Sequence, residues 1–287
     1  MDRMLRERRF WIIIVVGAVL GILIAWLTGP GRGPLVILPG QDATWRTVQS
    51  RGIWRVGMDP SFPPFETLDA AGQPVGYDVD LAHALADHWG VEAEIVAIGF
   101  DSLLDALQTG QVDAVVSALP YDPRETKDFR FSSPYFEAGV RLATRMESAI
   151  AGVKDLNGRT LAVEWGSSGD MLGRQLQREG IDLSLAQYPT PEEVVGALNE
   201  GRDAVDAALV DNVTLREAQG KGALVAAVGP PLESAPYVIA SPYRAPQMAA
   251  NIESALAALT ASGELTELEA RWFGSAPAEL TANSNSN

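Results

Sequence analysis

A pattern that occurs twice in the chain most constrains how it can fold. In residues 103–116 an amphipathic segment stops at Gly110 before a short apolar run. In residues 194–209 a similar segment stops at Gly201, and the apolar run that follows begins two residues further from its glycine than in the first copy. A helix that ends at a glycine and leads into a buried strand is a common unit of α/β proteins. Any two α/β units share some likeness, but the repeat favours two similar lobes, each with its own sheet.

Helix and strand patterns alternate along the rest of the body, which predicts an α/β fold with largely parallel sheets. Two extended segments, 139–144 and 237–241, can join the lobes as hinge strands. We therefore expect a discontinuous first lobe, residues 52–141 plus 238–273, and a second lobe at 145–235. A cleft between the two lobes follows from this arrangement.

The segments that flank the body have simple compositions. Residues 29–51 begin as a linker rich in glycine and proline and end in a short helix that Asp42 can cap before Gly52. Residues 275–287 are small and polar, and we expect this tail to be disordered.

The amino terminus carries a hydrophobic run of 18 residues, 10–27, without charge or proline. As a helix it spans about 27 Å, close to the roughly 30 Å core of a bilayer. Five arginines lie within residues 1–32, four of them before the run. The positive-inside rule then predicts a cytoplasmic segment at 1–9, a transmembrane anchor at 10–28, and a body outside the inner or cytoplasmic membrane.

A cleaved signal peptide is the alternative interpretation of this run. The small-residue A-x-A pattern of a cleavage site is missing, which favours an uncleaved anchor. The chain has no cysteine, and this excludes disulfides and a lipid-modified cysteine anchor.

The composition and net charge of the chain limit the classes of molecule that it can bind. The hydrophobic fraction of 47% and charged fraction of 21% are typical of a globular protein. The net charge is −15, and the arginine-rich amino terminus makes the body more acidic still. Such a body repels phosphate backbones, so we expect no nucleic-acid partner.

Polar and aromatic residues gather where predicted strands end. The loop 57–66 follows a short apolar strand and carries two aromatic rings and two carboxylates. Ser117 and Arg124 follow the first repeat, and Asp211 ends the strand of the second. Open α/β sheets bind ligands at the carboxyl ends of their strands. A guanidinium and a carboxylate there suit a ligand that carries both an ammonium and a carboxylate. Each residue alone also fits a structural role, Arg124 in a surface ion pair and Asp211 as a turn or cap residue.

A further candidate is Ser168, in a glycine- and serine-rich turn between a predicted strand and a helix. Free amides at a helix start bind anions, so Ser168 can offer both an amide and a hydroxyl to a ligand carboxylate. A plain amino-terminal cap is an equally good interpretation.

Signals for an enzyme are weak. His83 and His88 lie about 140° apart around a helix, so they do not form one metal face. The turn at 166–170 lacks the last glycine of a nucleophile elbow, and no phosphate-binding glycine loop occurs. We expect no catalytic residue, no metal and no cofactor.

Several motifs in order make the chain similar to a known family. Between residues 51 and 274 they are GMDPSFPPFE, GYDVDL, ALQTGQVDAVVS, FSSPYF, VDAALVD and ARWFG. This order resembles the periplasmic solute-binding proteins of polar-amino-acid ABC importers, the extracellular solute-binding protein family 3. The resemblance implies a two-lobed periplasmic-binding-protein fold of type II with two hinge strands.

The resemblance also assigns roles to the charged candidates. Arg124 would clamp the ligand carboxylate with help from Ser168, and Asp211 would hold the α-ammonium with help from the Ser117 carbonyl. These roles place one oppositely charged group on each lobe.

The pocket for the ligand side chain follows from the same resemblance. Phe62 and Phe100 would sandwich the side chain. Leu119 stands where the family usually has serine or threonine, which removes a hydroxyl but keeps the backbone amide. Glu164 replaces a usual apolar residue, and with Asp59 it would make the pocket acidic and favour a basic or polar amino acid.

Together these observations predict a membrane-tethered monomer that captures a free amino acid and delivers it to a separate ABC permease. Two alternatives stay open on the same fold. One is a periplasmic small-molecule lyase similar to cyclohexadienyl dehydratase, and the other is a ligand-sensing module.

Overall fold

The structure is a computed structural model that describes residues 42–274. The predicted cytoplasmic segment (1–9), the transmembrane anchor (10–28), most of the linker and the tail (275–287) lie outside these residues. Within 42–274, no helix combines the length and the apolar character that a bilayer crossing requires.

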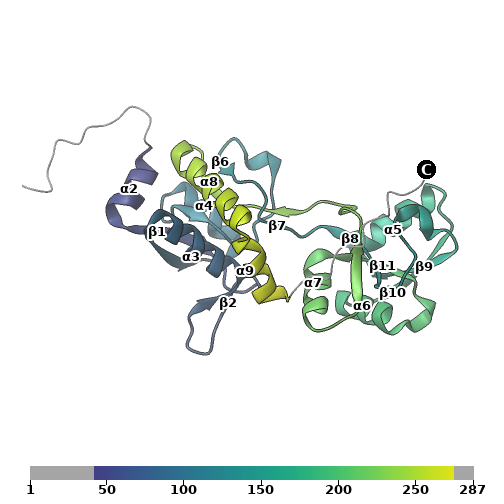
Figure 1. Cartoon of the computed structure of the whole chain (residues 1–287). Coiled ribbons are helices and arrows are strands. Elements are labelled where there is room, and N and C mark those ends of the chain that lie inside the picture. The colour runs from purple at the N-terminus through teal and green to yellow at the C-terminus, as the bar shows by residue number, and fades with distance from the viewer. Residues whose placement is uncertain (1–41, 275–287) are drawn as a thin grey trace, which may run out of the picture. The chain divides into compact units, whose positions relative to one another are not determined.

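Two five-stranded sheets organise the described chain (Figure 1). The first sheet has the order β4 (Glu92–Ala97), β1 (Ile53–Met58), β5 (Ala114–Val115), β14 (Ala240–Pro242), β6 (Phe129–Phe131). The second sheet has the order β10 (Leu183–Tyr188), β9 (Arg159–Glu164), β11 (Ala207–Asp211), β8 (Val140–Arg145), β12 (Val225–Val228).

The two sheets share one pattern of strand directions. In each, three neighbouring strands are parallel: β4, β1 and β5 in the first sheet, and β10, β9 and β11 in the second. The last two strands of each order are antiparallel to their neighbours. The apolar runs of the sequence repeat become β5 and β11, which occupy the same central place. The expectation of an α/β protein with two similar lobes is therefore confirmed.

Helices precede, connect and follow these strands. They are α2 (Ala43–Arg51), α3 (Tyr77–Trp89), α4 (Leu103–Gln108), α5 (Ser168–Arg178), α6 (Pro191–Glu200), α7 (Asn212–Gly220), α8 (Pro246–Ser262) and α9 (Glu264–Phe273). Short 3-10 turns occur at Phe100–Ser102, Pro123–Glu125, Val153–Leu156 and Arg202–Ala204. The predicted helix before Gly52 is confirmed as α2. Asp42 caps it by accepting a hydrogen bond from Trp45 N at 2.7 Å.

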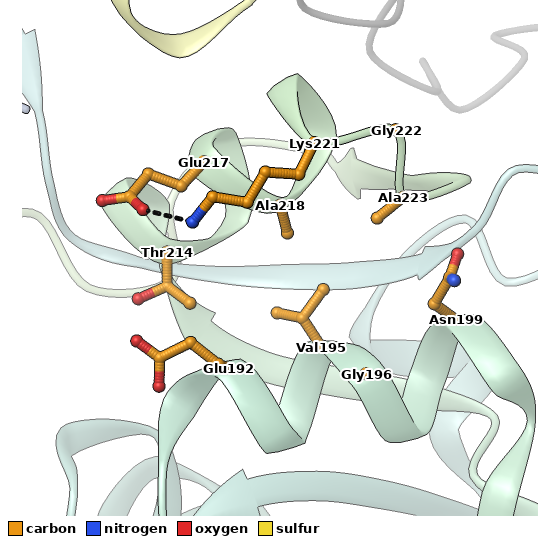
Figure 2. A pocket seen from close by; sticks show the side chains of 10 residues that line it. All are labelled: Glu192, Val195, Gly196, Asn199, Thr214, Glu217, Ala218, Lys221, Gly222 and Ala223. Atoms are coloured by element: carbon orange, nitrogen blue, oxygen red, sulfur yellow. Dashed lines mark hydrogen bonds and ion pairs between the residues drawn. The ribbon is translucent and has the colours of Figure 1, made fainter.

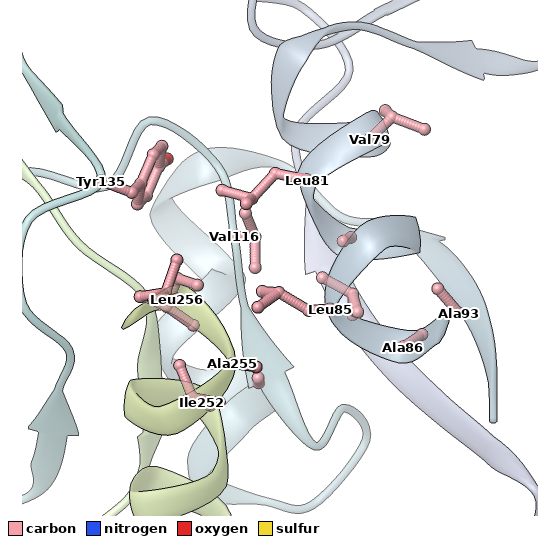
Figure 3. Packing of buried hydrophobic residues seen from close by; sticks show 14 of the residues in the cluster. Val79, Leu81, Leu85, Ala86, Ala93, Val116, Tyr135, Ile252, Ala255 and Leu256 are labelled. Carbon is pink, nitrogen blue, oxygen red and sulfur yellow. The ribbon is translucent and has the colours of Figure 1, made fainter. Parts of the chain in front are cut away.

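The core of the first lobe lies between sheet and helices. Leu81 and Leu85 of α3 meet Ile252 and Leu256 of α8, and Val116 lies next to them after β5 (Figure 3). These side chains recur at three- and four-residue spacing along their helices, so each helix presents one apolar face to the sheet.

The second sheet is covered on both faces, as a largely parallel sheet requires. Val194 and Leu198 of α6 pack in one buried cluster with Leu215 of α7. Leu176 of α5 packs in another cluster, against Leu161 of β9. Each strand of this sheet therefore buries its side chains in two directions.

A two-stranded ribbon lies where the chain passes from one sheet to the other. It pairs β7 (Phe136–Glu137) with β13 (Pro236–Tyr237). The Glu137 carboxylate accepts hydrogen bonds from Gly139 N (2.9 Å), Ala235 N (2.7 Å) and Ser234 Oγ (2.7 Å), so it ties both strands together. The strand that follows, β8, belongs wholly to the second sheet.

A second ribbon, β2 (Thr67–Leu68) with β3 (Pro74–Val75), projects from the first lobe (Figure 1). It precedes α3 and follows the aromatic loop 57–66. The loop is therefore held between β1 and this ribbon.

We predict that Gly139→Ala destabilises the protein by about 1–3 kcal/mol, the usual cost of forcing extra atoms into a packed site. A Cβ at Gly139 would lie 1.9 Å from the Glu233 carbonyl oxygen, so the two crossing segments must separate. Gly152→Ala is the control, because nothing lies within 4 Å of its added Cβ. Urea unfolding measures both, and equal stability of the two variants would contradict the close approach.

Candidate functional site

Two hollows lie at the carboxyl ends of parallel strands, one in each lobe. The first hollow measures about 320 Å³, and it is lined by Asp59, Ser61, Phe62, Glu66, Phe100, Ser117, Ala118, Pro120 and Tyr237. The second hollow measures about 220 Å³, and it is lined by Val140, Glu164, Ser167, Ser168, Gly169, Pro191, Val194, Leu209, Val210 and Asp211. Seven of the nine sequence-predicted site residues line one or the other.

The aromatic wall of the first hollow comes from two loops. Phe62 and Phe100 are 44% and 45% exposed, which leaves both rings open to a ligand. Phe62 stacks on Phe65, with ring centroids 5.6 Å apart and planes 5° from parallel. Because Phe65 is fully buried, it fixes one face of the exposed ring and leaves the other free.

Asp59 joins the strand end to this aromatic wall. Its Oδ2 accepts a hydrogen bond from Phe100 N at 2.9 Å, which orients the turn that begins with Phe100. The Asp59 side chain is half-buried at the first hollow. A carboxylate has further lone pairs after accepting one hydrogen bond, so Asp59 retains capacity for a ligand cation.

Backbone groups after β5 give the first hollow its polar floor. Ala118 has a φ of 41°, a left-handed conformation that is uncommon outside glycine. The Leu119 side chain packs in a buried apolar cluster with Leu103 and Phe129, so it does not line the hollow. Among the described residues, no hydrogen bond uses the Ser117 carbonyl or the Leu119 amide. These two groups have unused hydrogen-bonding capacity.

The second hollow lies between two helix starts. Glu164 ends β9, Ser168 begins α5, and Asp211 ends β11 immediately before α7. The amino ends of α5 and α7 carry partial positive charge and free amides, which favour an anionic group nearby. Gly169 allows the start of α5 to lie close to β11, since a Cβ at this position would lie 2.5 Å from the Leu209 carbonyl oxygen.

The cap of α5 is Ser167, so the interpretation of Ser168 as a plain cap is wrong. Ser167 Oγ accepts a hydrogen bond from Asp170 N at 3.2 Å and donates to the Glu164 carbonyl at 2.8 Å. Either serine of the pair suits a cap by type, and the turn geometry decides between them. No hydrogen bond among residues 42–274 uses the Ser168 hydroxyl, so the residue keeps its hydroxyl and amide available.

Asp211 caps α7, as its structural interpretation suggested. Its Oδ1 accepts from Thr214 N and its Oδ2 accepts from Thr214 Oγ, both at 2.8 Å. The carboxylate is thus held in one orientation at the second hollow. Its remaining lone pairs allow it to accept hydrogen bonds from an ammonium as well.

Arg124 lines neither hollow. It lies in the 3-10 turn Pro123–Glu125, its side chain is 86% exposed, and it pairs with Asp122 at 2.6 Å. Hydrogen bonds from Arg124 lower the pKa of the Asp122 carboxyl. The surface-ion-pair interpretation of Arg124 therefore describes this structure. An exposed pair contributes little to stability, so either partner can be exchanged for another ion.

Some residues of the hollows were not singled out from the sequence. They are Ser61, Glu66, Ala118, Pro120 and Tyr237 in the first hollow, and Val140, Ser167, Gly169, Pro191, Val194, Leu209 and Val210 in the second. Tyr237 reaches the first hollow from β13, far along the chain. No local sequence pattern predicts that a residue of β13 lines this hollow.

A third hollow of about 330 Å³ lies between α6 and α7 and contains none of the predicted site residues (Figure 2). Glu217 and Lys221 form an ion pair at 2.9 Å along one side of it. Thr214, which lines this hollow, also contacts Asp211. No group of three or more potential metal ligands was found within residues 42–274.

Comparison with protein families gives a match over nearly the whole described chain. Residues 54–275 match the model of the bacterial extracellular solute-binding proteins, family 3.

Individual proteins are similar over the same body. The L-arginine-binding protein of Pseudomonas aeruginosa is 28% identical and covers 76% of this chain and 87% of its own length. The L-cystine-binding protein TcyJ of Escherichia coli is 27% identical and covers 79% and 85%. Substrate-binding domain 2 of Lactococcus lactis GlnP, solved in an open conformation, is 25% identical with a TM-score of 0.67, covering 79% and 97%. The two-lobed periplasmic-binding-protein fold is thus established.

We predict that Asp211→Ala lowers the free energy of unfolding by about 1 kcal/mol, because a helix cap is lost. Asp211→Asn should change it little, since an asparagine oxygen can still accept from Thr214 N. Asp182→Ala, which removes an exposed carboxylate of the same lobe, should stay within about 0.5 kcal/mol of the parent. Urea unfolding compares the three, and an asparagine variant as unstable as the alanine variant would contradict capping.

Proposed function

Because the chain belongs to the bacterial extracellular solute-binding proteins of family 3, we propose that it captures a free amino acid and delivers it to an ABC permease. The observation that carries the proposal is the pair of hollows at the strand ends, each lined by polar groups of its own lobe. It acts outside the cytoplasm, as a receptor and not as an enzyme.

The polar groups match the two ends of an amino acid. Asp211 and the free Ser117 carbonyl are acceptors for an α-ammonium. The Ser168 amide and hydroxyl, the Leu119 amide and the Arg124 guanidinium are donors for an α-carboxylate. An ammonium and a carboxylate on one carbon need acceptors and donors a few ångströms apart, and a closed pair of lobes supplies both.

Arg124 must exchange partners in this proposal. Its guanidinium now meets Asp122, and a ligand carboxylate would take the place of that side chain. Because the pair is exposed to water, the exchange carries a small penalty. Bidentate hydrogen bonds to the ligand then favour the exchanged state.

Carboxylates in both hollows favour a basic side chain. Asp59 lies in the first hollow and Glu164 in the second, and no lysine or arginine lines either one. Phe62 and Phe100 would hold the aliphatic part of such a side chain, and their ring faces attract a cation. A neutral or acidic side chain would leave these carboxylates without a partner when the site excludes water.

Binding would stabilise the closed arrangement of the lobes. A ligand that contacts both lobes favours the state in which both contacts exist. We propose the type II hinge arrangement for this chain, with lobes expected at residues 52–141 plus 238–273 and at 145–235. Because β8 (Val140–Arg145) pairs within the second sheet, the boundary expected at residue 141 moves back to the ribbon of β7 and β13. The ribbon of β7 and β13 would then be the hinge, and a monomer suffices for the whole cycle.

A thermal-shift screen of the twenty amino acids on the full chain tests the proposal. Ligand at about 100 times its dissociation constant adds roughly 2.7 kcal/mol of stability. We expect arginine, lysine or histidine to give the largest shift. A screen in which no amino acid raises the melting temperature would defeat the receptor function.

The same assay tests Arg124 against a matched control. Arg124→Gln should abolish the shift, because the clamp on the α-carboxylate is gone. Lys127→Gln removes an equal charge from the same loop, 76% exposed, and should leave the shift unchanged. Equal binding by both variants would remove Arg124 from the site.

The tether is proposed from the sequence of residues 10–27, whose length and lack of charge suit a membrane anchor. We expect the full chain to sediment with membranes and to resist alkaline extraction. A variant in which a cleavable signal peptide replaces residues 1–41 should appear in the soluble extracytoplasmic fraction. A full chain that is exported, shortened and soluble would show cleavage instead.

A further inference from the structure

Two carboxyl groups are buried together beneath the first hollow. Glu66 is 1% exposed and Asp78 is fully buried. No ion pair among the described residues includes either group. Removing two like charges from water without a cation is very unfavourable, and such a pair retains a proton instead.

Backbone hydrogen bonds between the loop and the start of α3 bring the two carboxyl groups together. The loop before Glu66 lies on the start of α3, where Tyr77 N donates to the Pro64 carbonyl at 3.0 Å and Asp78 N donates to the Phe65 carbonyl at 2.9 Å. Gly76 makes this approach feasible, since its φ is 150° and a Cβ there would lie 2.0 Å from the Phe65 oxygen. The proximity of the two carboxyls is therefore set by the main chain.

Glu66 is connected to the first hollow through Ser117. Ser117 Oγ donates to Glu66 Oε1 at 2.9 Å and accepts from Asp59 N at 3.0 Å. The hydroxyl proton is committed to Glu66, because Asp59 N can only donate. Glu66 Oε1 is thus an acceptor.

Asp78 is connected to Ala118, the residue that follows Ser117. Its Oδ2 accepts from Ala118 N at 2.5 Å and from Tyr135 Oη at 2.9 Å. Asp78 also lies in the first turn of α3, where the helix dipole favours a negative charge. These contacts stabilise Asp78 as a carboxylate.

Two oxygens are left over, Glu66 Oε2 and Asp78 Oδ1. Both are buried, and neither has a donor among the other described residues. Two ionised carboxylates cannot hydrogen-bond to one another, but a carboxylic acid can donate to a carboxylate. Burial raises the pKa of both groups, and the hydrogen bond between them raises that of Glu66 while lowering that of Asp78.

We propose that Glu66 and Asp78 share one proton, carried by Glu66 Oε2 and donated to Asp78 Oδ1, and that they act as positioning residues for Ser117 and Ala118. The proton closes a ring of hydrogen bonds from Ser117 through both carboxyls to Ala118 N. This ring holds Ala118 at its left-handed φ of 41° and so aims the Ser117 carbonyl and Leu119 amide.

One carboxyl and three tyrosines surround the pair. The ionisable groups that act on the pair are Asp59, Tyr77, Tyr135 and Tyr237, from the strand end, α3, the loop before β7, and β13. Burial raises the pKa of all three tyrosines, so they stay neutral. The effect on ligand affinity rests on the proposed function, but the shared proton does not.

Infrared spectroscopy of the ligand-free full chain tests the shared proton directly. At neutral pH we expect the carbonyl band of one protonated carboxylic acid. Glu66→Gln should remove it, because Asp78 is then the one carboxyl of the pair and stays ionised, accepting from Ala118 N, Tyr135 Oη and the new amide. Glu92→Gln, on the exposed edge of the same lobe, should keep it. A missing band, or one that remains in Glu66→Gln, overturns the proposal.

Stability against pH gives a second, ligand-free readout. The raised pKa of Glu66 means that the folded state holds a proton that the unfolded chain releases above the usual pKa of about 4.3. Stability is therefore lost as pH rises from there toward the folded pKa. Relative to Glu66→Gln, the unfolding constant of the parent should grow by about tenfold per pH unit. A constant ratio across pH 5 to 8 contradicts the proposal.

The double variant separates a shared proton from two independent carboxyls. Each single amide can donate to the carboxyl that is left, but in Glu66→Gln with Asp78→Asn two amide NH₂ groups face one another. We expect the double variant to unfold more than tenfold more readily than the single variants predict together. Additive effects would overturn the proposal.

Binding of L-arginine, measured by calorimetry, tests the positioning role. Glu66→Ala should weaken binding at least tenfold, and Glu66→Gln should restore it to within about threefold, because only glutamine rebuilds the ring. Equal binding by the alanine and glutamine variants contradicts positioning. If the parent binds no amino acid while the infrared band is present, the proposed function fails and the shared proton stands.

Discussion

The need to bury a parallel sheet on both faces is the constraint on which the rest of the structure depends. Three parallel strands in each sheet require crossover helices, and these helices cover the faces. Strands that run in parallel also end together at one edge. Asp59 and Ser117 in the first sheet, and Glu164 and Asp211 in the second, meet because of this rule. The chemistry of the hollows is thus a consequence of how the core is made.

The same edges explain which parts of the site the sequence could predict. A strand that ends in a polar or acidic residue is visible locally, and Asp59 and Asp211 were found in this way, whereas Glu164 was found through the family resemblance. Asp42 and Gly52 likewise marked the ends of α2 by residue type alone. The repeat at Gly110 and Gly201 predicted two equivalent central strands because helix ends and buried strands both leave short-range patterns.

Contacts between distant segments, and the choice between neighbouring partners, were not predictable in this way. Tyr237 joins the first hollow only because β13 pairs with β7, and no spacing in the sequence encodes that pairing. Arg124 meets Asp122 through a turn geometry that composition does not fix. The choice of Ser167 over Ser168 as a cap depends on the local turn geometry. The sequence shows which polar side chains are available to a site. The folded structure shows which of them already have a hydrogen-bond or ion-pair partner.

The place of β14 in the first sheet has a consequence for synthesis. This strand, near residue 240, lies between β5 and β6, whose residues leave the ribosome more than a hundred positions earlier. The second sheet uses only residues 140–228, so all of its strands are available sooner. The lobe that is begun first is therefore completed last, and the inserted lobe can fold while its host still lacks a central strand.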